Sequence, residues 1–228
     1  MRPENQIIGA QFGAISRDQL QGVGVSECAI DHRVARCQLI PWFPGIYRHP
    51  VVPPSRMGEL TALQLWAGPE SFFSHRTGAE ILELDGAPQG LLEICVPLPL
   101  RYQGVKVHRI AAGDRPALIH RSGLRVAHIE RVLLDLAGTV RYGTLGLAMD
   151  DALRKHLTTL ARLKSALISY GARGKNGTRA LRTMIGWRDD LDGKLASKFE
   201  SKMRRILRRI GTLPHVAQHR VQDGAGVY

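Results

Sequence analysis

Two helix-start signals lie close together near the N-terminus, and they limit the fold of this segment more than any other feature. Ser16-Arg17-Asp18-Gln19 has the Ser-x-x-Gln form of a capping box, in which the hydroxyl and the amide satisfy each other's free backbone N–H groups. Gly22 or Gly24 ends this helix, because glycine readily adopts the positive φ of a helix C-terminus. Ser26 is the N-cap of the next helix. The sequence therefore predicts a helix, a short glycine turn and a second helix.

The second predicted helix, over residues 26–37, has one apolar face followed by a hairpin signal. Ile30, Val34 and Cys37 recur at helical spacing and form the predicted buried stripe. The predicted exposed face is polar and partly basic and carries Glu27, His32, Arg33 and Arg36. Two short strands, 39–42 and 46–48, then flank the turn Phe43-Pro44-Gly45. Together these elements predict a winged helix-turn-helix over residues 1–52.

A second region follows the stiff linker formed by Pro50, Pro53 and Pro54. It contains segments with the apolar spacing of helices and segments with the apolar pattern of strands. Helices are predicted over residues 59–66, 71–84 (with Ser74 as N-cap), 128–137, 145–153, 160–170 and 178–187, and strands over 91–96, 105–110, 117–119 and 123–126. We therefore expect an α+β domain over residues 53–190, with its helices gathered toward the end, and an α+β fold class for the chain.

The last region, residues 191–228, is predicted to begin with a basic helix. Ser197-Lys198-Phe199-Glu200 is another capping box, and it opens a helix that runs to Arg209. A strand is expected over residues 215–221, followed by the turn signal Asp223-Gly224-Ala225-Gly226. One helix and one strand bury too little surface to form a domain. We therefore expect this region to be an incomplete unit or to pack on the middle domain.

The charge is distributed unevenly along the chain. The formal net charge is +12, but residues 1–150 carry 15 Lys+Arg against 14 Asp+Glu, whereas residues 151–228 carry 17 against 6. Such a basic region attracts polyanions, because each phosphate that it neutralises releases condensed counterions. Nucleic acid is the expected partner. A purely compositional origin stays open, because 25 of the 32 basic residues are arginine.

Composition also predicts the compartment. No apolar run approaches the roughly 20 residues of a membrane-spanning helix, and the N-terminus has no basic stretch followed by a long apolar one. We therefore expect a cytoplasmic chain without membrane contact.

Cys28, Cys37 and Cys95 form no CxxC pair and are odd in number, which fits neither a disulfide framework nor a cysteine zinc site. They are expected to be reduced, half-buried core residues.

The predicted helix-turn-helix is expected to contact double-stranded DNA. In this arrangement the second helix lies in the major groove, with its N-terminal residues near base edges. The expected DNA-binding residues are Ser26, His32, Arg33 and Arg36 on this helix, Arg17 and Arg48 beside it, and Lys202, Arg205 and Arg209 in the C-terminal helix. Glu27 and Asp31 lie on the same helix, so a helix-turn-helix that contacts only protein stays an alternative.

Catalytic patterns are sparse. Ser74-His75-Arg76 places a hydroxyl beside an imidazole, but neighbours in sequence on a helix point in different directions, so capping and packing are expected instead. Asp150 and Asp151 are expected at a helix start, where the helix dipole favours acids. No complete catalytic site and no cofactor are therefore predicted.

Several segments resemble one known family, and they follow its order. The run from Gly13 to Arg48 resembles the N-terminal winged-helix domain of AbiEi-family antitoxins of type IV toxin-antitoxin, or abortive-infection, systems. The domain that follows it in that family is similar to residues 74–79, 91–97, 104–109, 131–137 and 150–155. Residues 197–200 with 204–209 resemble the opening helix of a very-short-patch-repair-like endonuclease domain of the PD-(D/E)XK class.

This resemblance implies two hypotheses. The first is a DNA-binding transcriptional regulator that acts as antitoxin to a separate nucleotidyltransferase toxin. The second is the N-terminal part of a metal-dependent DNA endonuclease that lacks its catalytic strands. In that class the helix glutamate, here Glu200, helps to hold a divalent metal, so Mg²⁺ is expected only if further acids complete the domain. A third hypothesis, which does not depend on the resemblance, is that the middle domain binds a protein and the chain makes no DNA contact.

Overall fold

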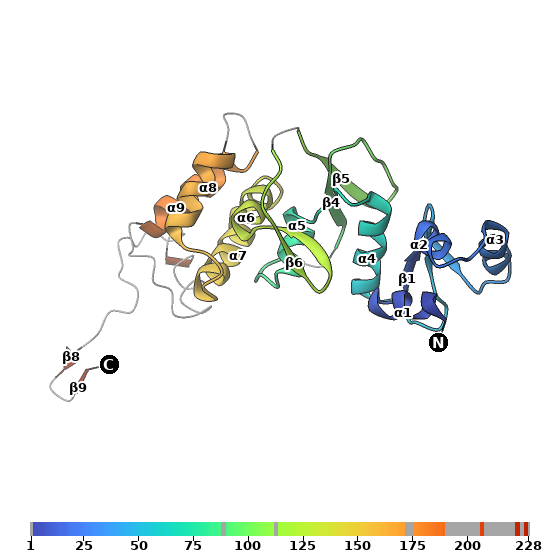
Figure 1. Cartoon of the computed structure of the whole chain (residues 1–228). Coiled ribbons are helices and arrows are strands. Elements are labelled where there is room, and N and C mark those ends of the chain that lie inside the picture. The colour runs from blue at the N-terminus through green and yellow to red at the C-terminus, as the bar shows by residue number, and fades with distance from the viewer. Residues whose placement is uncertain are drawn as a thin grey trace. The chain divides into compact units, whose positions relative to one another are not determined.

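The computed structural model describes residues 2–87, 90–111, 114–171, 176–189, 206–207, 222–223 and 226–227 (Figure 1). The fold is mixed α+β with small sheets. Contacts divide the chain into two units, Met1–Phe73 with Leu91–Val126, and Ser74–Gly90 with Ala127–Tyr228, here called the first and the second unit. The boundaries predicted at residues 52 and 190 stay predictions. None of the helices among the described residues has the length and apolar character needed to cross a membrane.

The N-terminal part of the first unit is built around a three-stranded sheet. Its elements are α1 (Pro3–Ala10), β1 (Ala14–Ser16), α2 (Arg17–Gly22), α3 (Glu27–Ala35), β2 (Ile40–Phe43) and β3 (Ile46–Arg48). The strand order is β1-β3-β2, and Ile15 pairs antiparallel with Tyr47 at its centre. The helices and the sheet share one apolar core, made of Ile8, Ile15, Leu20, Ile30, Leu39 and Tyr47.

The local signals of this segment are confirmed in their details. Ser16 and Gln19 form both hydrogen bonds of the capping box, each 3.0 Å long. The turn between α2 and α3 contains Gly24 with a φ of +86°, and the Ser26 hydroxyl accepts the backbone N–H of Ala29. These bonds explain why the two helices begin where the sequence places them.

The predictions for the cysteines are wrong at two positions. Helix α3 ends at Ala35, and Cys37 adopts a left-handed backbone with a φ of +55°, so its side chain leaves the predicted stripe and is exposed. Cys28 is also exposed, because it lies on the solvent side of α3, while Cys95 is fully buried. All three thiols are free.

The rest of the first unit supplies one more helix and two pairs of strands. These are α4 (Arg56–Ala67), the parallel pair β4 (Leu92–Val96) and β5 (Val105–Arg109), and the pair β6 (Leu118–Arg121) and β7 (Leu124–Ala127). The strand predictions are therefore confirmed to within about two residues. The helix predicted over residues 71–84 is shorter than expected, because Phe72 and Phe73 form β-bridges with Cys95 and Val126 instead.

The second unit is helical. It contains α5 (His75–Ile81), α6 (Ile129–Ala137), α7 (Tyr142–Arg154), α8 (Leu160–Tyr170) and α9 (Thr178–Asp189). Helix α6 contacts each of the other four helices, and all of its residues are buried. Asp150 and Asp151 lie in the last turns of α7 rather than at a helix start, which corrects the expected role of the helix dipole.

The C-terminal region is described only at short segments. Gln222–Asp223 (β8) and Gly226–Val227 (β9) pair antiparallel. The capping box at residues 197–200, most of the basic helix and the strand predicted over 215–221 lie outside the described residues.

Two helical glycines of the first unit give a matched test of this packing. A Cβ on Gly58 of α4 would lie 2.7 Å from the backbone oxygen of Phe12 and 3.0 Å from the Trp42 ring, whereas nothing lies within 4 Å of one on Gly9 of α1. Gly58→Ala should lower the free energy of unfolding by roughly 1–3 kcal/mol through overpacking. Gly9→Ala should leave it unchanged or raise it by up to about 1 kcal/mol through helix propensity. Urea unfolding of both variants checks this, and equal effects would contradict it.

Candidate functional site

Helix α3 is held by its apolar side and leaves its other sides to polar residues. Ile30 is fully buried in the core of the N-terminal segment, and Val34, one turn later, is half-buried. Residues at i and i+4 share one side of a helix, so the remaining positions fall into three further groups. Glu27 with Asp31 forms one group, Cys28 with His32 and Arg36 forms the second, and Ala29 with Arg33 forms the third.

The acidic group of α3 is bound by Arg17, the first residue of α2. Two nitrogens of its guanidinium bond Glu27 Oε1, at 3.2 Å, and Asp31 Oδ1. The third, Nε, donates to the Tyr47 hydroxyl at 3.1 Å. The hydrogen bonds to Asp31 and then to Tyr47 raise the pKa of Arg17 above its ordinary value, so the guanidinium stays charged. Arg17, which the sequence predicted as a DNA-binding residue, therefore makes its contacts within the first unit.

The second group forms an exposed stripe along α3, which we call the α3 stripe. It consists of Cys28, His32 and Arg36, all exposed, and it lies about 100° around the helix axis from the two acids. Neither His32 nor Arg36 forms an ion pair with any residue that the structure describes. Ser26 is also exposed, at the N-terminal end of the same helix. The structure therefore brings three of the predicted DNA-binding residues, Ser26, His32 and Arg36, onto one accessible helix.

Two other predicted DNA-binding residues have partners within the first unit. Arg33 is half-buried and forms an ion pair with Glu4 at 3.3 Å, and the Glu4 side chain is 8% exposed. Arg48 donates to the backbone oxygen of Val52 at 2.9 Å. Glu4 needs Arg33, because a buried carboxylate without a partner is strongly destabilising. Sequence spacing alone contained no signal for this pair, which joins α1 to α3.

The remaining predicted residues, Glu200, Lys202, Arg205 and Arg209, lie outside the residues that the structure describes.

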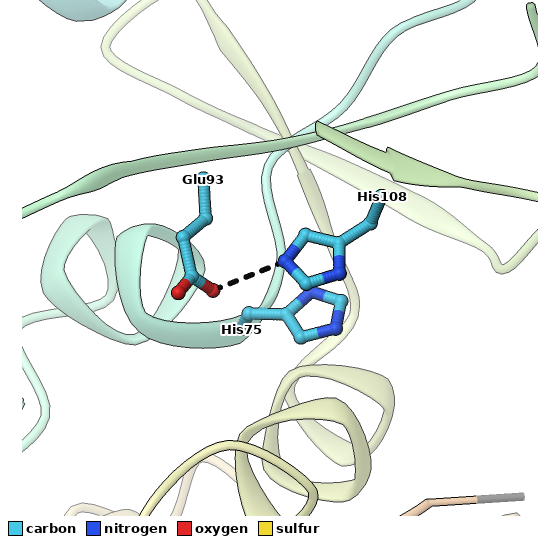
Figure 2. A group of neighbouring side chains, drawn as sticks. All are labelled: His75, Glu93 and His108. Carbon is cyan, nitrogen blue, oxygen red and sulfur yellow. Dashed lines mark hydrogen bonds and ion pairs between the residues drawn. The ribbon is translucent and has the colours of Figure 1, made fainter. Parts of the chain in front are cut away.

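A carboxylate and an imidazole meet on the parallel strands of the first unit (Figure 2). Glu93 on β4 is 1% exposed, and its Oε2 lies 3.3 Å from His108 Nε2 on β5. The other carboxylate oxygen lies 3.7 Å from the Lys106 ammonium. Carboxylate oxygens and imidazole nitrogens both bind metals, but Glu93 and His108 provide two ligands, fewer than the three protein ligands of a catalytic zinc site. The ammonium of Lys106 also neutralises the Glu93 carboxylate. Within this unit the arrangement is an ion pair on a sheet. His75, also drawn in Figure 2, begins α5 and belongs to the second unit.

The acids of α6 and α7 are buried in the second unit and paired there. Asp135 accepts from Arg131 and from the Ser74 hydroxyl, the latter at 2.7 Å. Ser74 thus occupies the predicted N-cap position but bonds an acid of α6 instead of capping its own helix. Asp150 accepts from Arg188 Nε at 2.6 Å, and Asp151 pairs with Lys155 at 2.8 Å.

Pairing of these acids leaves a basic exposed surface on the helices of the second unit. Glu130 is bound by Arg162, at 3.0 Å, and by the Thr158 hydroxyl, at 2.7 Å. Exposed basic side chains on or beside α7, α8 and α9 include Arg141, Lys164, Arg179 and Arg182. The second unit therefore presents exposed basic side chains, while its acids on α6 and α7 are buried in pairs.

The Glu130 pair predicts a pH-dependent stability. Burial by itself raises the pKa of Glu130, but hydrogen bonds from Thr158, from the backbone and from His128 outweigh it and hold this pKa below its ordinary value. The charged form therefore stabilises the fold above the ordinary pKa, and this contribution is lost as the pH falls through the folded-state pKa.

Thr158→Val should accordingly lower the free energy of unfolding by about 1 kcal/mol or more at neutral pH, because a hydrogen bond to a charged group is lost. The difference from the unmodified chain should shrink at acidic pH. Thr183→Val is the control, because its hydroxyl donates to the uncharged Arg179 carbonyl. Urea unfolding at several pH values measures both, and a Thr158→Val deficit independent of pH would refute the assignment.

Comparison with known proteins supports the fold alone. No family model matches the chain, and the search of curated proteins found no match. Among solved structures, the chain is similar to the RV2827C protein from Mycobacterium tuberculosis, with a TM-score of 0.50 and 17% identity over 81% of this chain and 75% of that chain.

Proposed function

We propose that this chain binds double-stranded DNA through the α3 stripe and acts as a transcriptional regulator of the antitoxin type. The observation that carries the proposal is the accessibility of His32 and Arg36 on the second helix of the α2–turn–α3 pair. A helix in the major groove needs one polar side free of contacts with its own domain. An arginine there bonds guanine edges or phosphates.

The surrounding elements support the same proposal. The β2–β3 hairpin follows α3 directly and joins β1 in one antiparallel sheet, which is the element order of a winged helix-turn-helix. In such a fold the hairpin is the wing beside the recognition helix. The predicted winged-helix layout is therefore part of the proposal.

The acids on α3 do not oppose DNA binding as strongly as their sequence positions suggested. Glu27 and Asp31 lie on another side of the helix from the α3 stripe, and Arg17 neutralises one of their two charges. Exposed basic side chains of the second unit, such as Arg179 and Arg182, are further candidates for phosphate contacts. The antitoxin role and the nucleotidyltransferase toxin as partner rest on the sequence resemblance.

Replacement of Arg36 tests the proposal. A preferred duplex would first be selected from a random-sequence library, and its affinity measured by fluorescence anisotropy. Arg36→Ala should weaken binding roughly 5- to 150-fold, the effect of losing a base-reading arginine. His32→Ala should also weaken binding.

The matched control is Arg2→Ala, which removes the same charge from an exposed position outside α3. It should leave the affinity within about twofold, since a charge that makes no direct contact with DNA contributes little at physiological salt. Arg33→Ala is a poor probe, because it leaves Glu4 buried and unpaired. Equal affinities of Arg36→Ala and Arg2→Ala would remove α3 from the interface and favour a role in protein binding alone.

A further inference from the structure

The second unit has an accessible pair of aromatic side chains where α7 begins and α9 ends. Tyr142 is the first residue of α7, and Trp187 lies two residues before the end of α9. Their ring centroids are 6.1 Å apart, and the ring planes are inclined by 41°. Tyr142 is 46% exposed and Trp187 is 37% exposed. Tryptophan is highly buried on average, so this pair is unusually available to a ligand with flat rings.

The residue that follows Trp187 holds the pair in place. Arg188 is buried, and its Nε donates to Asp150 Oδ1 of α7 at 2.6 Å. Another nitrogen of the same guanidinium donates to the Gly146 carbonyl of α7 at 3.1 Å. These bonds join the end of α9 to α7. Rings that are positioned in this way lose little conformational entropy when a ligand stacks on them.

The surface beside the aromatic pair is basic. Residues 152–188 contain nine Lys+Arg and no Asp or Glu. Arg179 and Arg182 lie on the same exposed side of α9 as Trp187, because the three positions fall within about 140° of the helix. Arg141, the N-cap residue of α7, is exposed as well. None of these three arginines forms an ion pair with a residue that the structure describes.

We propose that this surface binds single-stranded nucleic acid, with a base stacked on the Tyr142–Trp187 pair and phosphates bonded to the exposed arginines. Single-strand binding without sequence preference combines basic and aromatic side chains, because every base has a π-face. A duplex offers phosphates to the arginines but no free base face to the rings. A protein surface usually mixes both signs of charge, whereas nucleic acid matches a surface without acids. This surface belongs to the second unit and stands independently of α3.

Single-stranded probes test the proposal in the full-length chain. Fluorescein-labelled oligodeoxythymidylate and oligouridylate of about 16 nucleotides, the upper site size of a single-strand-binding fold, serve as probes in anisotropy titrations. At least one should bind saturably, and the tighter one distinguishes DNA from RNA as the ligand. An unlabelled oligonucleotide should also quench tryptophan fluorescence through the stacked base. Trp187→Leu should remove this quenching.

Matched variants locate the binding. Trp187→Leu keeps an apolar side chain but removes the aromatic face, and it should weaken binding of the better probe roughly 5- to 150-fold. Trp187→Phe should retain most of the affinity, and Tyr142→Leu should also weaken binding. Ile168→Ala is the control, because it removes an apolar side chain of α8 that is 86% exposed but has no aromatic face. It should leave the affinity unchanged.

Salt dependence and duplex binding complete the test. Arg179→Gln with Arg182→Gln should lower the slope of log affinity against log salt by about 0.7 per arginine. Trp187→Leu should leave duplex affinity unchanged, and thermal unfolding of each variant verifies folding. Absence of saturable binding by both probes, equal affinities of Trp187→Leu and Ile168→Ala for the single strand, or an equal loss of duplex binding in Trp187→Leu would each overturn the proposal.

Discussion

The Arg17 guanidinium joins three elements of the first unit, and the functional surface of that unit depends on it. It begins α2, bonds two acids of α3 and reaches the Tyr47 hydroxyl on β3. Partly exposed ion pairs contribute little stability, typically under about 1 kcal/mol each. The importance of Arg17 therefore lies in geometry and charge. It binds Glu27 and Asp31 on the side of α3 that faces α2, and the α3 stripe stays accessible to solvent.

In the second unit, by contrast, acidic side chains are buried and paired with basic or hydroxyl side chains. Helix α6 is buried on all sides, so its Glu130 and Asp135 lose water and need partners. Arg131 of the same helix supplies one, and Ser74, Thr158 and Arg162 supply the others from outside α6. Breaking one partner leaves an uncompensated charge, so these pairs specify how the helices assemble. Exposed basic side chains on α8 and α9 include Lys164, Arg179 and Arg182.

Local signals predicted the fold well wherever the deciding interaction is short-range. The capping box of Ser16 and Gln19 and the N-cap Ser26 act within three residues, and both are confirmed. Predictions failed where distant residues decide. Phe72 and Phe73 leave the predicted helix to pair with strands, and the Ser74 hydroxyl bonds Asp135 rather than its own helix.

The same distinction applies to the candidate site. Helical periodicity identified the exposed side of α3 and hence His32 and Arg36. It did not indicate that Arg33 forms an ion pair with Glu4 or that Arg17 forms one with Asp31, because 29 and 14 residues separate these pairs in sequence.

Protection of Cys28 from alkylation tests the central claim, that the α3 stripe contacts DNA. Cys28 is exposed on this stripe and Cys95 is buried, so a Cys37→Ser variant leaves Cys28 as the reactive thiol among the native cysteines. A reference variant with Cys28→Ser, Cys37→Ser and Ser122→Cys places the thiol in the exposed turn between β6 and β7. Saturating duplex DNA should slow maleimide labelling of Cys28 much more than labelling at position 122. Equal labelling rates of Cys28 with and without DNA, or no DNA binding at all, would contradict the account.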